Sequence, residues 1–112
     1  MKRYGMVLGL KADKIAEYKR LHTAVWPEVL RQIAACNLRN YTLYLRRLPD
    51  GKYYLFSTFE YVGVDLAADL AAMAADPATQ RWWALCMPFQ EPLPDRAEGE
   101  WWASMEEVFH CD

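Results

Sequence analysis

Two β-rich runs in the middle of the chain most constrain how it can fold. Residues 40–47 (NYTLYLRR) and 52–61 (KYYLFSTFEY) are joined by Leu48-Pro49-Asp50-Gly51, a sequence typical of a tight turn. The pattern predicts an antiparallel hairpin. The second run is apolar at both odd and even positions, so we expect both faces of its sheet to need cover.

A strand and a helix are predicted before this hairpin. Residues 3–10 alternate between large and small side chains, which predicts a strand whose small face something else packs against closely. The large face carries Tyr4, Met6, Leu8 and Leu10, and the small face carries Gly5, Val7 and Gly9. Asp13 is expected to cap the helix that follows.

Two helices and a last strand are predicted after the hairpin. Asp65 can cap an alanine-rich helix that runs to about Ala75. Asp76-Pro77 then offers a capping residue followed by proline at the first helical position. Residues 90–100, rich in proline and acidic residues, are expected to form a loop, and Trp101–His110 (WWASMEEVFH) a final strand.

The order strand, helix, strand, strand, helix, strand is the split βαβ arrangement of ferredoxin-like α+β folds. With right-handed crossovers it gives a four-stranded antiparallel sheet with the helices on one face. The other face would be bare although it carries aromatic side chains. We therefore expect two copies of the chain to pair sheet to sheet as a homodimer.

Composition narrows the class of protein. The 112 residues are predicted to form one domain, residues 1–112. A net charge of −2 gives no basic surface for nucleic acid, and the longest apolar run, Ala67–Ala75, is too short to span a bilayer. No signal peptide is expected at the N-terminus. Three widely spaced cysteines indicate free thiols in the cytoplasm, and two distant histidines give no metal-binding pattern.

The first predicted helix carries the strongest candidate site. Tyr18, His22 and Trp26 recur at steps of four, which places a hydroxyl, an imidazole and an indole on one side of a helix. Pro27 must then kink this helix or begin a second one. Histidine can exchange protons near neutral pH, so His22 is a candidate acid or base. A partly buried histidine of the core explains the same pattern.

Further aromatic residues are candidates for binding a ligand. Five tryptophans and seven tyrosines exceed what one small core can hold, so some are expected to line a site or an interface. Trp82 and Trp83 are adjacent, and because they point about 100° apart on a helix, only one is expected to face a given pocket. Tyr41 lies at a strand end, where it is either a ligand contact or an edge aromatic.

These motifs together resemble the L-rhamnose mutarotase family. The matching elements cover nearly the whole chain in order: Tyr18-x-x-x-His22-x-x-x-Trp26-Pro27-Glu28, Asn40-Tyr41, Gln80-Arg81-Trp82-Trp83 and Glu107-Val108-Phe109. The resemblance implies a cytoplasmic homodimer with the dimeric α+β barrel fold. It also implies an isomerase that interconverts the α and β anomers of L-rhamnose with no metal or organic cofactor.

Carried over residue by residue, the resemblance makes His22 the proton donor. It makes Tyr18, Tyr41, Trp82 and Trp83 the sugar-binding residues. L-Fucose or another 6-deoxy sugar stays open as the substrate. Two other functions share the expected architecture, namely a cofactor-free or haem-linked monooxygenase and a non-catalytic sugar-binding dimer.

Overall fold

The predicted hairpin forms one half of the sheet in the computed structural model, which describes residues 1–112. Strands β2 (Leu38–Arg47) and β3 (Tyr53–Tyr61) pair antiparallel. In the turn between them the Gly51 amide donates to the Leu48 carbonyl at 2.9 Å. Gly51 has φ +81°, a backbone conformation that glycine adopts without steric cost. The turn chemistry of the sequence therefore sets the hairpin, as predicted.

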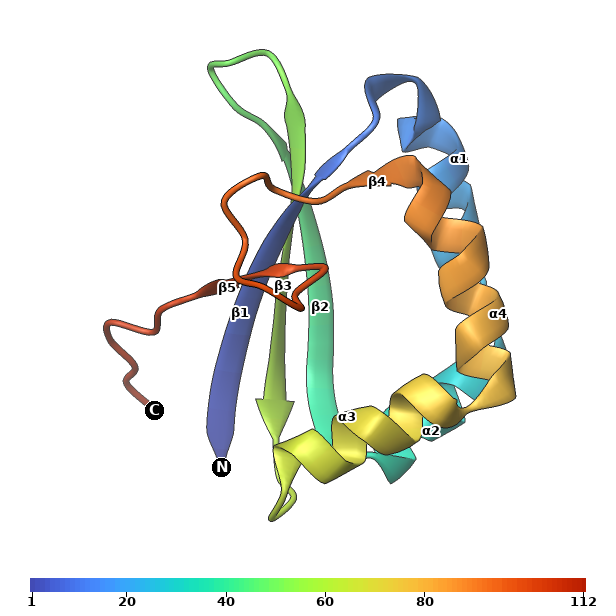
Figure 1. Ribbon diagram of the computed structural model, residues 1–112, viewed down its shortest axis with the longest axis vertical. Coiled ribbons are helices and arrows are strands. Elements are labelled where there is room, and N and C mark those ends of the chain that lie inside the picture. Colours follow the sequence, from blue (N-terminus) through green and yellow to red (C-terminus); the bar gives the residue numbers. More distant parts are fainter.

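Strand β1 (Lys2–Leu10) pairs with the other edge of β3 and completes the centre of an antiparallel sheet. The sheet order is β2-β3-β1-β4, the arrangement of a ferredoxin-like α+β fold. Two short strands share the outer edge of β1 (Figure 1). Strand β4 (Gln90–Glu91) pairs with Gly9 and Leu10, and β5 (Ala103–Met105) pairs with residues 5–7.

The prediction of a continuous last strand over Trp101–His110 was wrong. Only Ala103–Met105 pair with β1, and residues 106–112 run away from the sheet without regular structure. The composition favours a strand, but pairing depends on the path that the whole chain takes. Strand β5 runs antiparallel from Val7 to Gly5, and the chain leaves the sheet after Met105 although residues 2–4 of β1 continue along the same edge. Glu106 and Glu107 follow directly, and glutamate is depleted in strands.

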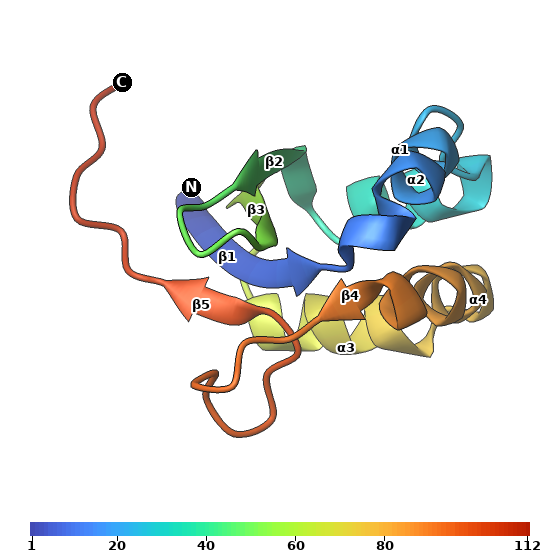
Figure 2. The same ribbon diagram turned by 90° about the horizontal axis from the view of Figure 1, so that it is seen from above.

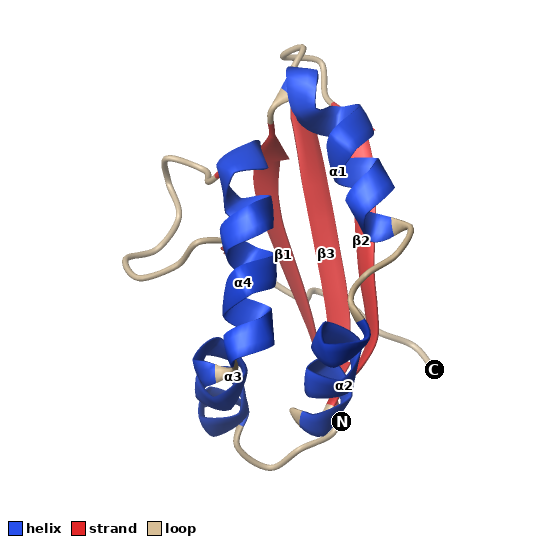
Figure 3. Cartoon of the chain, turned by 90° about the vertical axis from the view of Figure 1, so that its right-hand side faces the viewer, coloured by secondary structure: helices blue, strands red, loops and turns tan.

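All four α-helices lie on one face of the sheet (Figure 3). They are α1 (Ile15–His22), α2 (Pro27–Ala35), α3 (Leu66–Ala75) and α4 (Pro77–Cys86), with short 3₁₀ turns at Ala12–Lys14 and Met87–Phe89. The predicted break at Pro27 separates two helices, and Pro27 is the first residue of α2. None of the helices is long and apolar enough to cross a membrane.

Two of the three predicted helix caps are confirmed. The Asp65 side chain accepts from the Ala68 amide at 3.1 Å, and the Asp76 side chain accepts from the Thr79 amide at 2.9 Å. Asp13 does not cap a helix, because it lies inside the 3₁₀ turn that precedes α1. The backbone already turns at Lys11, whose carbonyl accepts from the Lys14 amide at 3.0 Å, so no capping position remains at residue 13.

The core lies between the sheet and the helices, in two groups of buried side chains. One joins α1, α2 and α4 to one end of the sheet and contains Leu8, Leu10, Tyr18, Val29, Leu55, Trp82 and Cys86. The other joins the opposite end of the sheet to α3 and contains Cys36, Leu38, Phe59, Tyr61 and Met73. Ser57 lies on β3 between Leu55 and Phe59. It is 0% exposed, and its hydroxyl makes no hydrogen bond.

The predicted close packing at the small face of β1 occurs at its edge. A Cβ atom added to Gly9 would lie 2.9 Å from the carbonyl oxygen of Glu91, and one added to Gly5 would lie 2.9 Å from the Cε of Met105. These glycines therefore let β4 and β5 approach the edge of β1. On the face away from the helices, Tyr44 is 61% exposed.

Candidate active site

The site begins at the end of α1. The rings of Tyr18 and His22 stack with their centres 4.3 Å apart, as their spacing of one helical turn allows. His22 Nδ1 lies 2.8 Å from the Tyr18 carbonyl oxygen. A carbonyl oxygen can only accept, so Nδ1 carries the hydrogen and donates it. The other ring nitrogen, Nε2, is therefore the one left to accept or return a proton.

Tyr18 and His22 line a cavity of about 250 Å³ between α1 and the sheet. Its opposite wall is mostly aliphatic, and the lining also includes Leu10, Lys19, Leu43, Tyr44, Leu45 and Leu55. An apolar cavity with a few polar groups at one side is the usual form of a small-molecule site. A second cavity of about 290 Å³ lies near Met1 and Val64, and its lining contains no histidine. Of these two cavities, the one at Tyr18 and His22 is therefore the candidate for acid/base chemistry.

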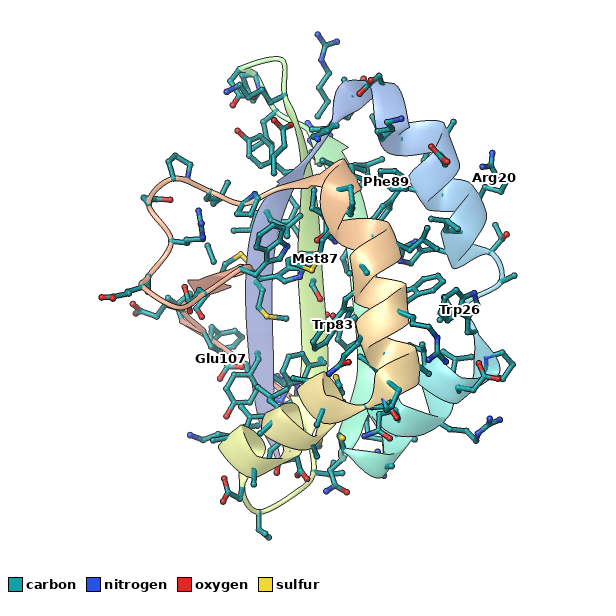
Figure 4. All side chains as sticks on the ribbon, turned by 45° about the vertical axis from the view of Figure 1, so that its right-hand side comes forward. Arg20, Trp26, Trp83, Met87, Phe89 and Glu107 are labelled. Atoms are coloured by element: carbon teal, nitrogen blue, oxygen red, sulfur yellow. The ribbon has the colours of Figure 1, made fainter.

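Helix α4 supplies an indole to this site. Trp82 is 6% exposed and packs edge-on against His22, with ring centres 5.4 Å apart. Trp26 also packs edge-on against Trp82, with ring centres 5.2 Å apart. Trp83 is 38% exposed, and Figure 4 shows Trp83 and Trp26 on different sides of α4. Of the predicted tryptophan pair, the structure brings Trp82 to His22 and does not bring Trp83 there.

Tyr41 reaches the helix-covered face through a bulge in β2. The pairing register jumps from Arg39–Glu60 to Thr42–Thr58, so two residues of β2 lie opposite Phe59 alone. Tyr41 stacks on Phe59 with ring centres 5.9 Å apart and planes within 7°. Its ring is partly exposed, but burial of the hydroxyl end raises its pKa.

The Tyr41 hydroxyl lies near two other polar groups. The Ser57 hydroxyl partly offsets the rise in the pKa of Tyr41, although Ser57 Oγ completes no hydrogen bond. Tyr41 in turn helps to raise the pKa of Tyr18, a rise caused first by burial. Tyr41 therefore affects the pKa of Tyr18, but it does not line the cavity at Tyr18 and His22, and its role in binding the sugar stays a prediction.

Two residues of the site were missed by the sequence analysis. Gln90 Nε2 donates to the Tyr18 hydroxyl at 3.1 Å, and Trp101 Nε1 donates to Gln90 Oε1 at 2.8 Å. Gln90 opens β4, and Trp101 follows the loop. Nothing in the local pattern distinguishes Gln90 from the loop residues after it, because its partner Tyr18 lies 72 positions away.

No group of three or more His, Cys, Asp and Glu side chains is arranged to hold a metal ion. The cavity instead joins an imidazole and a phenol to a mostly aliphatic wall, and the buried Trp82 indole packs against the imidazole without lining the cavity. Such a site suits a small polyhydroxylated ligand that exchanges protons. The fold and the site thus define an α+β domain of the dimeric-barrel type with an acid/base cavity for such a ligand.

Comparison with known proteins supplies the family. Residues 3–111 match the family model described as L-rhamnose mutarotase. The chain is 32% identical to an L-rhamnose mutarotase from Opitutus terrae over 112 residues, all of both chains. It is 35% identical to an L-fucose mutarotase from Xanthomonas campestris pv. campestris, covering 97% of this chain and 87% of that protein. This chain belongs to the L-rhamnose mutarotase family.

A solved structure supports the fold independently. The crystal structure of an L-rhamnose mutarotase from Formosa agariphila superposes with a TM-score of 0.76 at 19% identity, covering 100% of both chains. The predicted α+β fold is confirmed. The chain is a sugar mutarotase by family, an isomerase that acts at an anomeric carbon, and neither the monooxygenase nor the sugar-binding alternative is favoured.

Proposed function

We propose that this chain interconverts the α and β anomers of L-rhamnose, with His22 as the main proton-transfer group. The observation that carries this proposal is the hydrogen bond from His22 Nδ1 to the Tyr18 carbonyl, which leaves Nε2 as the free nitrogen of a ring that lines the cavity. The family match supports L-rhamnose as the substrate. The similarity to an L-fucose mutarotase makes L-fucose the first alternative.

Anomer exchange needs one acid and one base. The anomeric hydroxyl loses its proton while the ring oxygen gains one, and the bond between the ring oxygen and C1 breaks to give the open-chain aldehyde. C1 then rotates, and the same ring oxygen closes on its other face. In our proposal His22 Nε2 accepts and later returns the proton of the anomeric hydroxyl. Tyr18, or a bound water, supplies the proton to the ring oxygen.

The environment of Tyr18 supports its role as a hydrogen-bond donor. Burial raises the pKa of Tyr18 well above its usual value, so the phenol keeps its proton at neutral pH. Trp82 and the aliphatic wall would hold the apolar side of the pyranose, and Tyr41 would bind a hydroxyl group from the sheet side. Trp83 stays in the proposal as a predicted sugar contact; it lies away from His22, and its partial exposure leaves its ring open to a ligand.

We also propose that the chain, residues 1–112 as one domain, works as a cytoplasmic homodimer. The outer face of the sheet has no helix over it, and it carries the exposed ring of Tyr44 opposite Phe56. The three cysteines are free, which fits a reducing compartment. Sedimentation analysis should give the mass of two chains, and a Tyr44→Lys variant should shift the protein toward one chain.

Saturation-transfer NMR tests the activity. Anomer exchange is measured for L-rhamnose, L-fucose and further 6-deoxyhexoses with and without the wild-type protein, under air and under nitrogen. We expect faster exchange for L-rhamnose than for the other sugars, and the same rate in both atmospheres. Exchange of every sugar at its rate in water would refute the function, and faster exchange of L-fucose than of L-rhamnose would refute the substrate assignment.

A further inference from the structure

The hydrogen bonds at Tyr18 have one consistent direction, which begins at Trp101. An indole N–H can only donate, so the Gln90 atom 2.8 Å from Trp101 Nε1 must be the carbonyl oxygen. This contact fixes which way the Gln90 amide points. Without such a donor, the two ends of a glutamine amide could exchange places.

The fixed amide then determines what Tyr18 can do. Gln90 presents its NH₂ group to the Tyr18 hydroxyl at 3.1 Å, so the Tyr18 oxygen accepts from Gln90. The Tyr18 proton is thereby left for another partner. Tyr18 lines the cavity, and its ring is held against His22 by stacking. The direction that remains for the phenol proton is toward a ligand.

A loop holds Trp101 in the place that this arrangement needs. Figure 2 shows the chain leaving β4, turning back and returning toward β5. The loop is closed by its own hydrogen bonds, since Arg96 donates to the Glu100 carbonyl at 2.8 Å and to the Leu93 carbonyl at 2.9 Å. The Glu100 side chain accepts from the Ala97 amide at 3.1 Å. The residue directly after this closed loop is Trp101.

We propose that Trp101 and Gln90 are positioning residues that make Tyr18 a hydrogen-bond donor to the sugar. This inference rests on the proposed mutarotase function. Trp101 orients the Gln90 amide, and Gln90 occupies the acceptor side of the Tyr18 hydroxyl. Neither residue needs to touch the sugar. Both act by ensuring that the phenol presents its proton, and not its lone pairs, to the cavity.

Two substitutions change the direction of the hydrogen bond at the Tyr18 hydroxyl with little change in the shape of the substituted side chain. Trp101→Phe keeps an aromatic ring but removes the N–H, so the Gln90 amide is free to turn its oxygen to Tyr18. Gln90→Glu offers Tyr18 only acceptor oxygens, so the phenol donates to the carboxylate and its proton is lost to the sugar. Trp102→Phe is the matched control, because the Trp102 side chain packs against the core and its indole makes no hydrogen bond to Gln90.

The test measures the efficiency of anomer exchange in these variants, alone and combined with Tyr18→Phe. We expect Trp101→Phe to lower it about 3- to 10-fold, Gln90→Glu by at least as much, and Trp102→Phe to leave it unchanged. In the Tyr18→Phe background the first two changes should have no further effect, because both act through the phenol proton.

The outcomes separate this inference from the function itself. Wild-type rates in both Trp101→Phe and Gln90→Glu, or losses that add in full to the loss from Tyr18→Phe, would overturn the positioning role while the mutarotase function stands. A wild-type protein that did not accelerate anomer exchange would refute the function and this role together.

Discussion

Replacing His22 separates its chemical role from its structural one. Three contacts of the ring are seen: the hydrogen bond to the Tyr18 carbonyl at 2.8 Å, the stack on Tyr18 at 4.3 Å and the edge contact with Trp82 at 5.4 Å. The hydrogen bond contributes about 1 kcal/mol and each aromatic contact about 0.5–1 kcal/mol. His22→Ala should therefore lower the unfolding free energy by about 2–3 kcal/mol, or the melting temperature by about 8–12 °C.

His22→Asn keeps one of these contacts. Its amide nitrogen can replace Nδ1 as donor to the Tyr18 carbonyl, but it has no counterpart of Nε2. The expected loss of stability is about 1–2 kcal/mol, since only the ring contacts are lost. Both variants should nevertheless lose the same activity, about 10²- to 10⁴-fold in anomer exchange, because proton transfer is absent in both.

The assay is saturation-transfer NMR on L-rhamnose at a temperature well below both melting points, with melting followed by circular dichroism. His110→Asn is the matched control, since the His110 ring contacts Asp112 on the exposed tail, at 2.9 Å. It should change neither rate nor melting temperature by a measurable amount. A His22→Asn enzyme that retained more than about a tenth of the wild-type rate would refute the role of Nε2.

Three further predictions concern stability. Burial raises the pKa of Cys86 from 9.0 to about 11, so with rising pH the thiol ionises first in the unfolded chain. The protonated thiol therefore favours the folded state fully below about pH 9. This contribution of about 2 kcal/mol should be lost as the pH rises from about 9 to about 11. Chemical denaturation measures the unfolding free energy of wild type and Cys86→Ala over that pH range. The same pH dependence of this free energy in both proteins would contradict the prediction. Ser57→Ala removes a buried hydroxyl that has no partner, so the melting temperature of the ligand-free protein should rise by about 4 °C, whereas Thr58→Ala on the outer face should not raise it. Gly9→Ala should lower the unfolding free energy by about 1–3 kcal/mol, because its Cβ would lie 2.9 Å from the backbone oxygen of Glu91. Gly5→Ala should lower it less, because its Cβ would meet the movable end of the Met105 side chain. Equal losses of stability in urea denaturation would show that β4 shifts to accept the added methyl group.

Features set by neighbouring residues were predicted from the sequence. The caps at Asp65 and Asp76, the break at Pro27 and the turn at Gly51 each depend on a few adjacent residues. The stack of Tyr18 on His22 follows from helical spacing in the same way. Local chemistry of this kind is readable because no distant partner is needed.

Features set by distant partners were not predicted. The point at which the last strand leaves β1 depends on the path of the whole chain, and the contact between Gln90 and Tyr18 joins residues 72 positions apart. The bulge that turns Tyr41 inward has a positive φ at Asn40, 50°, which asparagine adopts more readily than most residues, but an asparagine alone does not locate a bulge. The sequence identified the tryptophan that contacts His22 only as one of a pair, because which of the two side chains points toward His22 depends on how α4 packs.

Two short strands, β4 and β5, share the outer edge of β1 in place of one long strand, and this arrangement affects how the protein avoids aggregation. A long open strand edge is a template for another chain, but β4 and β5 cover parts of the β1 edge in two short pieces. The opposite edge, β2, is interrupted by its bulge and carries Arg39, Arg46 and Arg47. Neither edge offers a long uncharged ladder of free amides and carbonyls. Chains that meet in solution are therefore directed away from edge-to-edge growth, which leaves the open face of the sheet as the surface for the dimer that we propose.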